Sequence, residues 1–425
     1  MRSVLSFALL AANVVSAAVV APFDYSGYKV IRIPTQKGNV KEVQRIITDL
    51  NLDTWKYPKT EGQNADIVVP PKQIPSFMER IAGMDSQIMH ENLGMSISNE
   101  TSFEAYEAGF APDINWFKSY HSYQDHISYL QDLQGLFRSR SEFVDAGKSH
   151  EGRTIPALHL WGKSGKNSKP AIIFHGTIHA REWITTMPQQ VTEYLAWSLL
   201  SQYNNNEDIT SIVDNFDIWV FPIVNPDGFA YTQTNNRLWR KNRQPNPNAR
   251  CPGRDLNRNY PYQWVGPGSS SNPCSDTYRG AQAGDGTEIK VHIANMKKIS
   301  AYHGIAMFVD WHSYGQLFMS PYGYSCTARP STDARHQELS KIFAQALKAV
   351  HGTPFKTGPI CSTIYQVNGD SVDWALEVLK VKLSLTAELR DTGSSGFVLP
   401  AAQIIPSGEE TLAGTVAMLK AVISG

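Results

Sequence analysis

The sequence has 425 residues, more than one hydrophobic core usually serves, so we expect at least two folding units. Hydrophobic residues make up 42% of the chain and charged residues 18%, which excludes a disordered or a fibrous protein. Basic and acidic residues balance at 39 each, which argues against a nucleic-acid-binding protein, although a neutral total can hide a local basic patch.

The N-terminus, MRSVLSFALLAANVVSA, carries one arginine before an apolar run and ends in Val15-Ser16-Ala17. These features predict a signal peptide over residues 1–17 and therefore a secreted, extracellular protein. A buried N-terminal helix is the alternative. No later segment is apolar over the ~18 residues that a membrane helix needs, so we expect no membrane partner for the mature protein.

The segment from about residue 25 to residue 100 alternates strand and helix patterns. YKVIRIPT and ADIVVPP are typical of strands, whereas NVKEVQRIITDLN and KQIPSFMERIAG are typical of helices. This order within so few residues predicts a small α+β domain. The polar stretch over residues 95–113 is predicted to be a linker, and its glycosylation sequon at Asn99 fits an exposed position.

From about Trp116 onward the chain contains four nearly continuous apolar runs: PAIIFHG, FDIWVFPIVNP, IAMFVDWHS and VKLSLTAEL. Strands that are covered on both faces need such runs, so we predict an α/β domain with a mostly parallel sheet. Helical patterns lie between the runs. The last helix is predicted to open with a capping box formed by Ser407 and Glu410.

Polar side chains stand where these four runs end. His179 and Glu182 follow the first run, Asn225 and Asp227 follow the second, His312 ends the third, and Glu388 ends the fourth. Because sites form beyond the carboxyl ends of parallel strands, we expect these side chains to converge. A hydrolytic zinc site takes three His or carboxylate ligands and keeps one position for water. The H-x-x-E spacing of the first two is a weak signal alone, and His312 is the best-placed third ligand. We interpret His175, inside the strand, as a packing residue.

Four cysteines occur, and their even number in a secreted chain favours two disulfides. Three connectivities are possible, and pairing neighbours would give Cys251–Cys274 and Cys326–Cys361. The spacings lack the paired CxxC pattern of a structural zinc site.

Seven motifs in a fixed order carry a resemblance to a known family: HAREW (179–183), RLWRKNR (237–243), DLNRNY (255–260), NPCSDTYRG (272–280), HSY (312–314), IYQVNGDSVDW (364–374) and ELRDTG (388–393). With them, the chain resembles the zinc metallocarboxypeptidases of the pancreatic carboxypeptidase A/B type over nearly its whole length. The resemblance implies a mixed, mostly parallel sheet flanked by helices, preceded by a small α+β, ferredoxin-like prosegment. It also implies a monomer that hydrolyses peptide and protein C-termini.

The resemblance implies a role for each site residue. One Zn²⁺ would be bound by His179, Glu182 and His312, with Asp255 accepting a hydrogen bond from His179. Glu388 would act as general base and acid, and Arg240 as the electrophilic stabiliser. The substrate-binding residues would be Arg181, Asn257, Arg258, Ser313, Tyr314, Tyr365 and Val372. The family also supports the Cys251–Cys274 bridge, while Cys326–Cys361 matches a bridge of only some members.

The resemblance places Val372 at the main selector position of the side-chain pocket, where basic-specific members carry an acid. With apolar Ile360, Val367 and Met319 around it, we expect preference for hydrophobic C-terminal residues. Asp370 departs from the usual glycine of the pancreatic enzymes. It either points to solvent or enters the pocket wall and admits Lys or Arg as well.

The prosegment is expected over residues 18–110 as an intramolecular inhibitor, with the catalytic domain over residues 111–425. The junction near 109–113 has no Lys or Arg around it, so a trypsin-like activating protease is not expected. Two other hypotheses are a catalytically silent carboxypeptidase-like binding protein and another zinc amidohydrolase. Retention of Glu388 argues against the first, and retention of Asn257, Arg258 and Tyr365 argues against the second.

Overall fold

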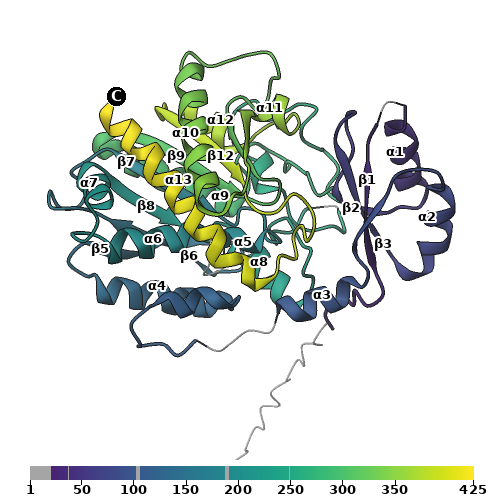
Figure 1. The fold of residues 1–425 in the computed structure, drawn as a ribbon, viewed down its shortest axis with the longest axis horizontal. Helices are drawn as coiled ribbons and strands as arrows, with labels where there is room; N and C mark the ends of the chain where they lie inside the picture. Colours follow the sequence, from purple (N-terminus) through teal and green to yellow (C-terminus); the bar gives the residue numbers. More distant parts are fainter. Residues whose placement is uncertain (1–20, 37, 102–105, 187–190, 248) are drawn as a thin grey trace, which may run out of the picture.

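The computed structural model describes residues 21–36, 38–101, 106–186, 191–247 and 249–425, so the expected signal peptide lies outside the described residues. Two units are visible in Figure 1: a small N-terminal one with a four-stranded sheet and a larger one built on an eight-stranded sheet. None of the helices within these ranges has the length and apolar character needed to cross a membrane.

The small unit is an antiparallel sheet with two helices against one face. Its strands are β1 (Lys29–Pro34), β2 (Asp53–Lys56), β3 (Asn64–Val69) and β4 (Gln87–His90), in the order β2-β3-β1-β4. Its helices are α1 (Val40–Asp49) and α2 (Ile74–Arg80). Alternate residues such as Ile31, Ile33 and Ile67 form a core with the buried face of α1. This β-α-β-β-α-β order is the expected ferredoxin-like arrangement.

A third helix, α3 (Leu93–Glu100), occupies the first part of the expected linker. Asn92 caps this helix because its side chain accepts a hydrogen bond from the Met95 amide at 3.2 Å, and Leu93 and Glu100 are buried. The linker prediction was therefore wrong for these residues, although Asn99 of the sequon is exposed, as expected.

The large unit is built on a mixed sheet of eight strands in the order β11-β10-β12-β9-β7-β8-β6-β5. The four predicted apolar runs contain its central parallel strands: β7 (Ala171–Gly176), β8 (Asp217–Phe221), β9 (Ile305–His312) and β12 (Leu383–Glu388). The outer strands are β5 (Ser141–Lys148), β6 (Thr154–Leu160), β10 (Leu317–Ser320) and β11 (Lys356–Pro359). The predicted mixed, mostly parallel sheet is confirmed.

Helices cover both faces of this sheet, which explains the continuous apolar runs. Residues 172 and 174 of β7 pack in one core cluster, and residue 173 packs in the other. The first cluster includes residues of α4 (Tyr123–Leu136), α6 (Val191–Ser201), α7 (Glu207–Asn215), α8 (Pro226–Thr234), α10 (Asp333–His351) and α13 (Ile404–Ser424). The second includes residues of α9 (Thr287–His303), α11 (Ile360–Thr363) and α12 (Ser371–Glu377).

The last helix begins earlier than predicted. Helix α13 starts at Ile404, so Ser407 lies inside it and donates to the Gln403 carbonyl at 2.7 Å. Glu410, the other expected partner of the capping box, accepts a hydrogen bond from Arg390 at 2.7 Å instead. The capping-box prediction was wrong because a tertiary ion pair uses the glutamate.

Both disulfides join neighbouring cysteines, Cys251 with Cys274 and Cys326 with Cys361. The second connects the chain beyond β10 to the short helix α11, next to Ile360. Each bridge therefore ties down a loop of the large unit rather than linking its two core clusters.

Candidate metal centre and active site

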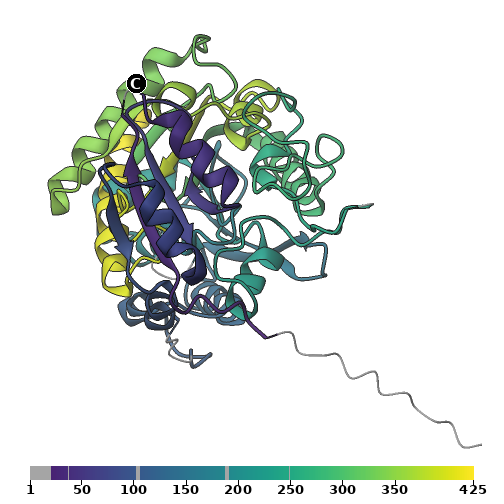
Figure 2. The ribbon, with the colours of Figure 1, turned by 90° about the vertical axis from the view of Figure 1, so that its right-hand side faces the viewer.

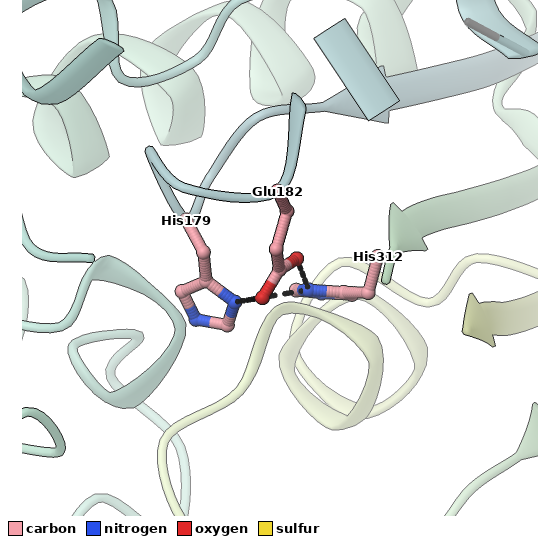
Figure 3. A group of neighbouring side chains, drawn as sticks. All are labelled: His179, Glu182 and His312. Carbon is pink, nitrogen blue, oxygen red and sulfur yellow. Dashed lines mark hydrogen bonds and ion pairs between the residues drawn. The ribbon is translucent and has the colours of Figure 1, made fainter. Parts of the chain in front are cut away.

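Three predicted ligands converge at the carboxyl ends of two adjacent strands (Figure 3). His179 and Glu182 lie on the turn after β7, and His312 is the last residue of β9. The Glu182 carboxylate lies 2.8 Å from His179 Nδ1 and 2.9 Å from His312 Nδ1. All three side chains are buried. The turn requires Gly176, because a Cβ there would lie 2.5 Å from the Thr185 carbonyl oxygen.

The donor set fits a zinc ion. The two Nδ1 atoms face each other at 3.1 Å, while each Nε2 faces a carboxylate: Asp255 at 3.0 Å from His179 and Asp310 at 2.9 Å from His312. An imidazole that donates from Nε2 presents a lone pair at Nδ1, so both lone pairs and the Glu182 oxygens meet at one point. Two nitrogens and a carboxylate are the ligands of a hydrolytic zinc site.

Electrostatics keep the carboxylates of this centre ionised. Burial by itself would raise the pKa of Glu182, but the adjacent imidazoles of His179 and His312 lower it overall. Burial opposes ionisation of Asp255 as well, but Arg240 and His179 hold its pKa well below the ordinary value. Both carboxylates are therefore ionised, as binding of a cation by Glu182 requires.

Glu388 lies beside the metal centre because β12 runs parallel to β9, with Glu388 in register with His312. Burial and the nearby Glu182 carboxylate raise the pKa of Glu388 to about 8. Arg240 also lies beside the metal centre, donating from Nε and Nη2 to Asp255 at 3.0 and 2.9 Å. Its Nη1 is 3.6 Å from Glu182, so this guanidinium edge faces the centre.

Asn257 and Arg258 stand on a single 3₁₀ turn (Leu256–Arg258) whose N-cap is Asp255. Arg258 is fixed by hydrogen bonds from Nε to the Gly268 carbonyl and from Nη1 to the Asn257 carbonyl, at 2.9 and 2.8 Å. The Asn257 amide donates to Asp310 at 3.2 Å. Both residues line the same pocket as His179, His312 and Glu388.

This pocket is also lined by apolar side chains. They include Val372 together with the other three expected apolar residues, Met319, Ile360 and Val367. Asp370 also lines it. Its Oδ1 caps helix α12 by accepting from the Asp373 amide at 2.9 Å, whereas its Oδ2 is buried and has no hydrogen-bond partner among the described residues. Burial raises the pKa of Asp370 to about 6.

The remaining predicted substrate-binding residues lie around the pocket mouth. The Ser313 amide donates to Glu182 at 3.3 Å, and Arg181 Nη1 donates to Asp276 at 2.9 Å. Tyr365 lines the pocket, but the Tyr314 hydroxyl donates to Asp66 of the small unit at 2.6 Å. Every predicted site residue thus lies within or beside one region, and the small unit contacts two of them, Tyr314 and Tyr365.

The small unit packs over this region through its edge strand β2, which faces the large unit in Figure 1. In Figure 2 the small unit lies in front of the large one. Lys56 lies 4.1 Å from the centre of the Tyr314 ring, and Lys59 lies 4.5 Å from that of Tyr365. The Gln63 side chain donates to the Ile364 carbonyl at 2.7 Å. The small unit thereby contacts two residues that line the pocket, Ile364 and Tyr365, and Tyr314 beside them.

Sequence reasoning missed Asp310. It lies two residues before His312 on β9, so both side chains point to the same face of the sheet, and the D-x-H pattern was a usable signal. His175, interpreted as a packing residue, is not among the metal-binding group but lies 2.6 Å from Asp310.

Comparisons with known proteins agree with this geometry. Residues 126–414 match the family model described as zinc carboxypeptidase, and residues 31–100 match the one described as carboxypeptidase activation peptide. Metallocarboxypeptidase A of Arthroderma otae is 91% identical over 425 residues, which is 100% of both chains. Carboxypeptidase A2 of Rattus norvegicus is 36% identical over 397 residues, or 92% of each chain. The crystal structure of thrombin activatable fibrinolysis inhibitor has a TM-score of 0.86 at 25% identity, covering 95% of this chain and 100% of that one.

Proposed function

Because the chain belongs to the zinc carboxypeptidase family and carries its activation peptide, we propose that this metallocarboxypeptidase is secreted and releases hydrophobic residues from peptide C-termini. One observation carries the proposal: the two histidines of a buried His-Glu-His group line one pocket with Glu388, Arg258 and several apolar side chains. The signal-like N-terminus and the two disulfides support secretion.

We assign zinc binding to His179, Glu182 and His312. A bound zinc ion would lower the pKa of a water ligand towards about 7 and polarise the scissile carbonyl. The raised pKa of Glu388 suits it to act as the general base for the attacking water and as the general acid for the leaving amine. Arg240, held by Asp255, directs its Nη1 edge towards the charge that develops on the carbonyl oxygen.

Arg258, Asn257 and Tyr365 are assigned to the terminal carboxylate of the substrate. Arg258 is buried and already oriented, so its guanidinium loses little freedom when a carboxylate binds. A cation fixed in a pocket beside the metal centre selects a free C-terminus, which supports exopeptidase rather than endopeptidase or amidase activity. The apolar lining of the pocket supports a hydrophobic terminal side chain.

A second candidate specificity, for Lys and Arg as well, has one observation in its favour. Asp370 Oδ2 is a buried acceptor with no partner among the described residues, in the wall of the same pocket. An ammonium group that reached it would be paired inside the pocket. Since the pKa of Asp370 is about 6, such pairing would strengthen as the pH rises through that value.

We propose that residues 18–110 are the inhibitory prosegment and that processing near 109–113 releases the domain over residues 111–425. In support, the small unit contacts Tyr314 and Tyr365 at the pocket mouth. Phe110, within this junction, is 66% exposed, so a protease can reach it.

The decisive experiment is a time course of hydrolysis by the processed protein with peptides that end in Leu, Phe, Lys or Glu. We expect single-residue release that is fastest for Leu and Phe and that is lost with a chelator and restored by zinc. No release from any peptide would contradict the enzymatic assignment. Release of Lys that grows between pH 5 and pH 8, and is lost in Asp370→Asn, would establish the second specificity; asparagine retains the helix cap.

A further inference from the structure

His175 and Asp310 form a buried pair directly behind the metal centre, and the activity proposed above assigns neither of them a role. The two residues are in register on the parallel strands β7 and β9, so their side chains stand next to each other on one face of the sheet. His175 Nε2 lies 2.6 Å from Asp310 Oδ1, and neither side chain is exposed to solvent.

The other oxygen of Asp310 reaches the metal centre. Asp310 Oδ2 lies 2.9 Å from His312 Nε2 and accepts hydrogen bonds from Ser371 Oγ at 2.5 Å and Asn257 Nδ2 at 3.2 Å. One carboxylate therefore contacts a predicted metal ligand, a predicted substrate-binding residue and the first residue of α12, which precedes Val372 of the pocket.

A series of hydrogen-bonding side chains extends from this pair into the core. His175 Nδ1 lies 3.2 Å from His292 Nε2, and His292 Nδ1 lies 2.8 Å from the Tyr260 hydroxyl. Burial lowers the pKa of His292 well below its usual value, so this imidazole is neutral.

The contacts of this chain limit which atoms can donate. Asp310 as a carboxylate can only accept, so only His175 can be the donor of that pair. The Tyr260 hydroxyl can donate to His292 Nδ1, and His292 Nε2 then faces His175 Nδ1. The chain of contacts ends at the Asp310 carboxylate, which lies beside His312 Nε2.

Each imidazole of the metal centre has a carboxylate beside its Nε2. His179 faces Asp255 and His312 faces Asp310, while both Nδ1 atoms face Glu182. His312 Nε2 also lies 2.9 Å from Asn257 Nδ2. The two carboxylates differ in partner, because Arg240 donates to Asp255 and His175 contacts Asp310.

We propose that Asp310 and His175 are positioning residues for zinc binding: Asp310 fixes His312 with its Nδ1 lone pair towards the metal, and His175 fixes Asp310. The inference rests on the proposed zinc site. A carboxylate that accepts from the second nitrogen of a ligand imidazole fixes its tautomer and raises its basicity, and removing such a partner typically costs about 10–100-fold in metal affinity.

The test measures zinc affinity of the full-length proenzyme by competition with a chromophoric chelator, so that it does not depend on activity. Asp310→Asn is expected to weaken zinc binding about 10–100-fold and His175→Ala about 10-fold, whereas His175→Gln, whose amide can still donate, retains most of the affinity. The visible spectrum of the cobalt(II) form is expected to change in Asp310→Asn, because it reports the ligand geometry.

The chain offers a matched control in His159, another buried histidine, which lies 2.8 Å from the buried carboxylate of Asp217 in the same sheet. His159→Ala removes a comparable pair and should leave zinc affinity within about twofold of wild type, since neither residue contacts a predicted ligand. If it weakens zinc as much as His175→Ala, the effect is general destabilisation and the proposal is wrong.

The proposal also fails if folded Asp310→Asn, checked by its melting temperature, binds zinc as tightly as wild type and keeps the wild-type cobalt spectrum. If His175→Ala does not fold, His175→Gln and Asp310→Asn decide the result. A wild-type protein that takes up no zinc would instead contradict the zinc site itself, so the two failures are distinguishable.

Discussion

The two units of the molecule differ in where the partners of their buried carboxylates lie. In the large unit, the buried carboxylates at the metal centre find their partners inside the same unit: Asp255 contacts His179 and Arg240. In the small unit, the buried Glu100 pairs with Arg237 of the large unit, at 2.6 Å. The metal centre is therefore complete within its own unit, whereas the pair of Glu100 and Arg237 joins the two units.

We expect this difference to separate catalysis from the inhibition proposed above. A change at the metal centre should alter chemistry without affecting how the small unit docks. A change in the small unit should alter docking and leave the mature enzyme as it was, because the small unit is absent from it. The following variants test that separation, and activity of the intact proenzyme relative to the processed enzyme measures the docking.

The largest effect is expected from Glu388→Gln. Glutamine keeps the size of the side chain but cannot take a proton, so kcat of the processed enzyme should fall by roughly 10²–10⁴-fold or more. Zinc content, measured by atomic absorption, should be unchanged. Glu338→Gln, on the exposed surface of α10, is the control and should retain full activity. Loss of zinc in Glu388→Gln would show that the division between ligands and base is wrong.

Glu100→Ala should produce the largest change in docking. It leaves Arg237 without a carboxylate in a buried site, and breaking such a pair costs about 3–5 kcal/mol. Arg237 keeps hydrogen bonds to the carbonyls of Arg181 and Phe397, so we expect the lower end of this range, or about 10²-fold more activity in the intact proenzyme.

The control for this variant is Glu42→Ala, which removes an exposed pair with Arg45 at 2.8 Å. Such surface pairs contribute at most about 0.5 kcal/mol, so proenzyme activity should stay the same. Equal proenzyme activity in Glu100→Ala and wild type would mean that this ion pair does not hold the small unit in place.

A smaller effect is expected from Asp66→Asn. Asp66 holds Arg32 with both oxygens at 2.6 Å and accepts from the Tyr314 hydroxyl of the large unit at 2.6 Å. Asparagine retains one acceptor, so the loss should be roughly 1–2 kcal/mol and proenzyme activity should rise about tenfold. If circular dichroism shows that the small unit of this variant is unfolded, the rise in proenzyme activity results from lost folding and not from weaker docking.

The smallest effect should come from Lys59→Ala. This lysine is exposed and lies over the ring of Tyr365, a contact worth about 0.5–1 kcal/mol. Proenzyme activity should rise about two- to fivefold, and raising the salt concentration should reduce the difference from wild type. A rise as large as that of Glu100→Ala would overturn the ranking of buried over exposed contacts.

Most of the fold could be predicted from the sequence. The central strands β7, β8, β9 and β12 are covered on both faces, and only continuous apolar runs satisfy that condition, so the runs located them. The first part of the expected linker, which forms α3, and the start of α13 were missed. In both cases a glutamate of the helix forms a tertiary ion pair, Glu100 with Arg237 and Glu410 with Arg390. The polarity of the local sequence does not reveal such a partner.

Much of the candidate site was predictable too, because the strand-end residues and the seven motifs contain the side chains that lie together around the metal centre. His175 was interpreted as a packing residue, although its contact is a carboxylate that supports a predicted ligand. The D-x-H spacing of Asp310 and His312 was visible in the sequence, but its partner across the sheet was not.

The sequence by itself determined the kinds of side chains and their local spacing, since covalent geometry fixes which residues share a turn or a strand face. His179 and Glu182 had to lie together, as did Asp310 and His312. Only the tertiary structure decided that His312 reaches Glu182 across 130 residues, that His175 stands beside Asp310, and that Glu100 is buried against Arg237. Such contacts depend on how strands pair and units dock, and the free energy of burying many apolar residues elsewhere decides both.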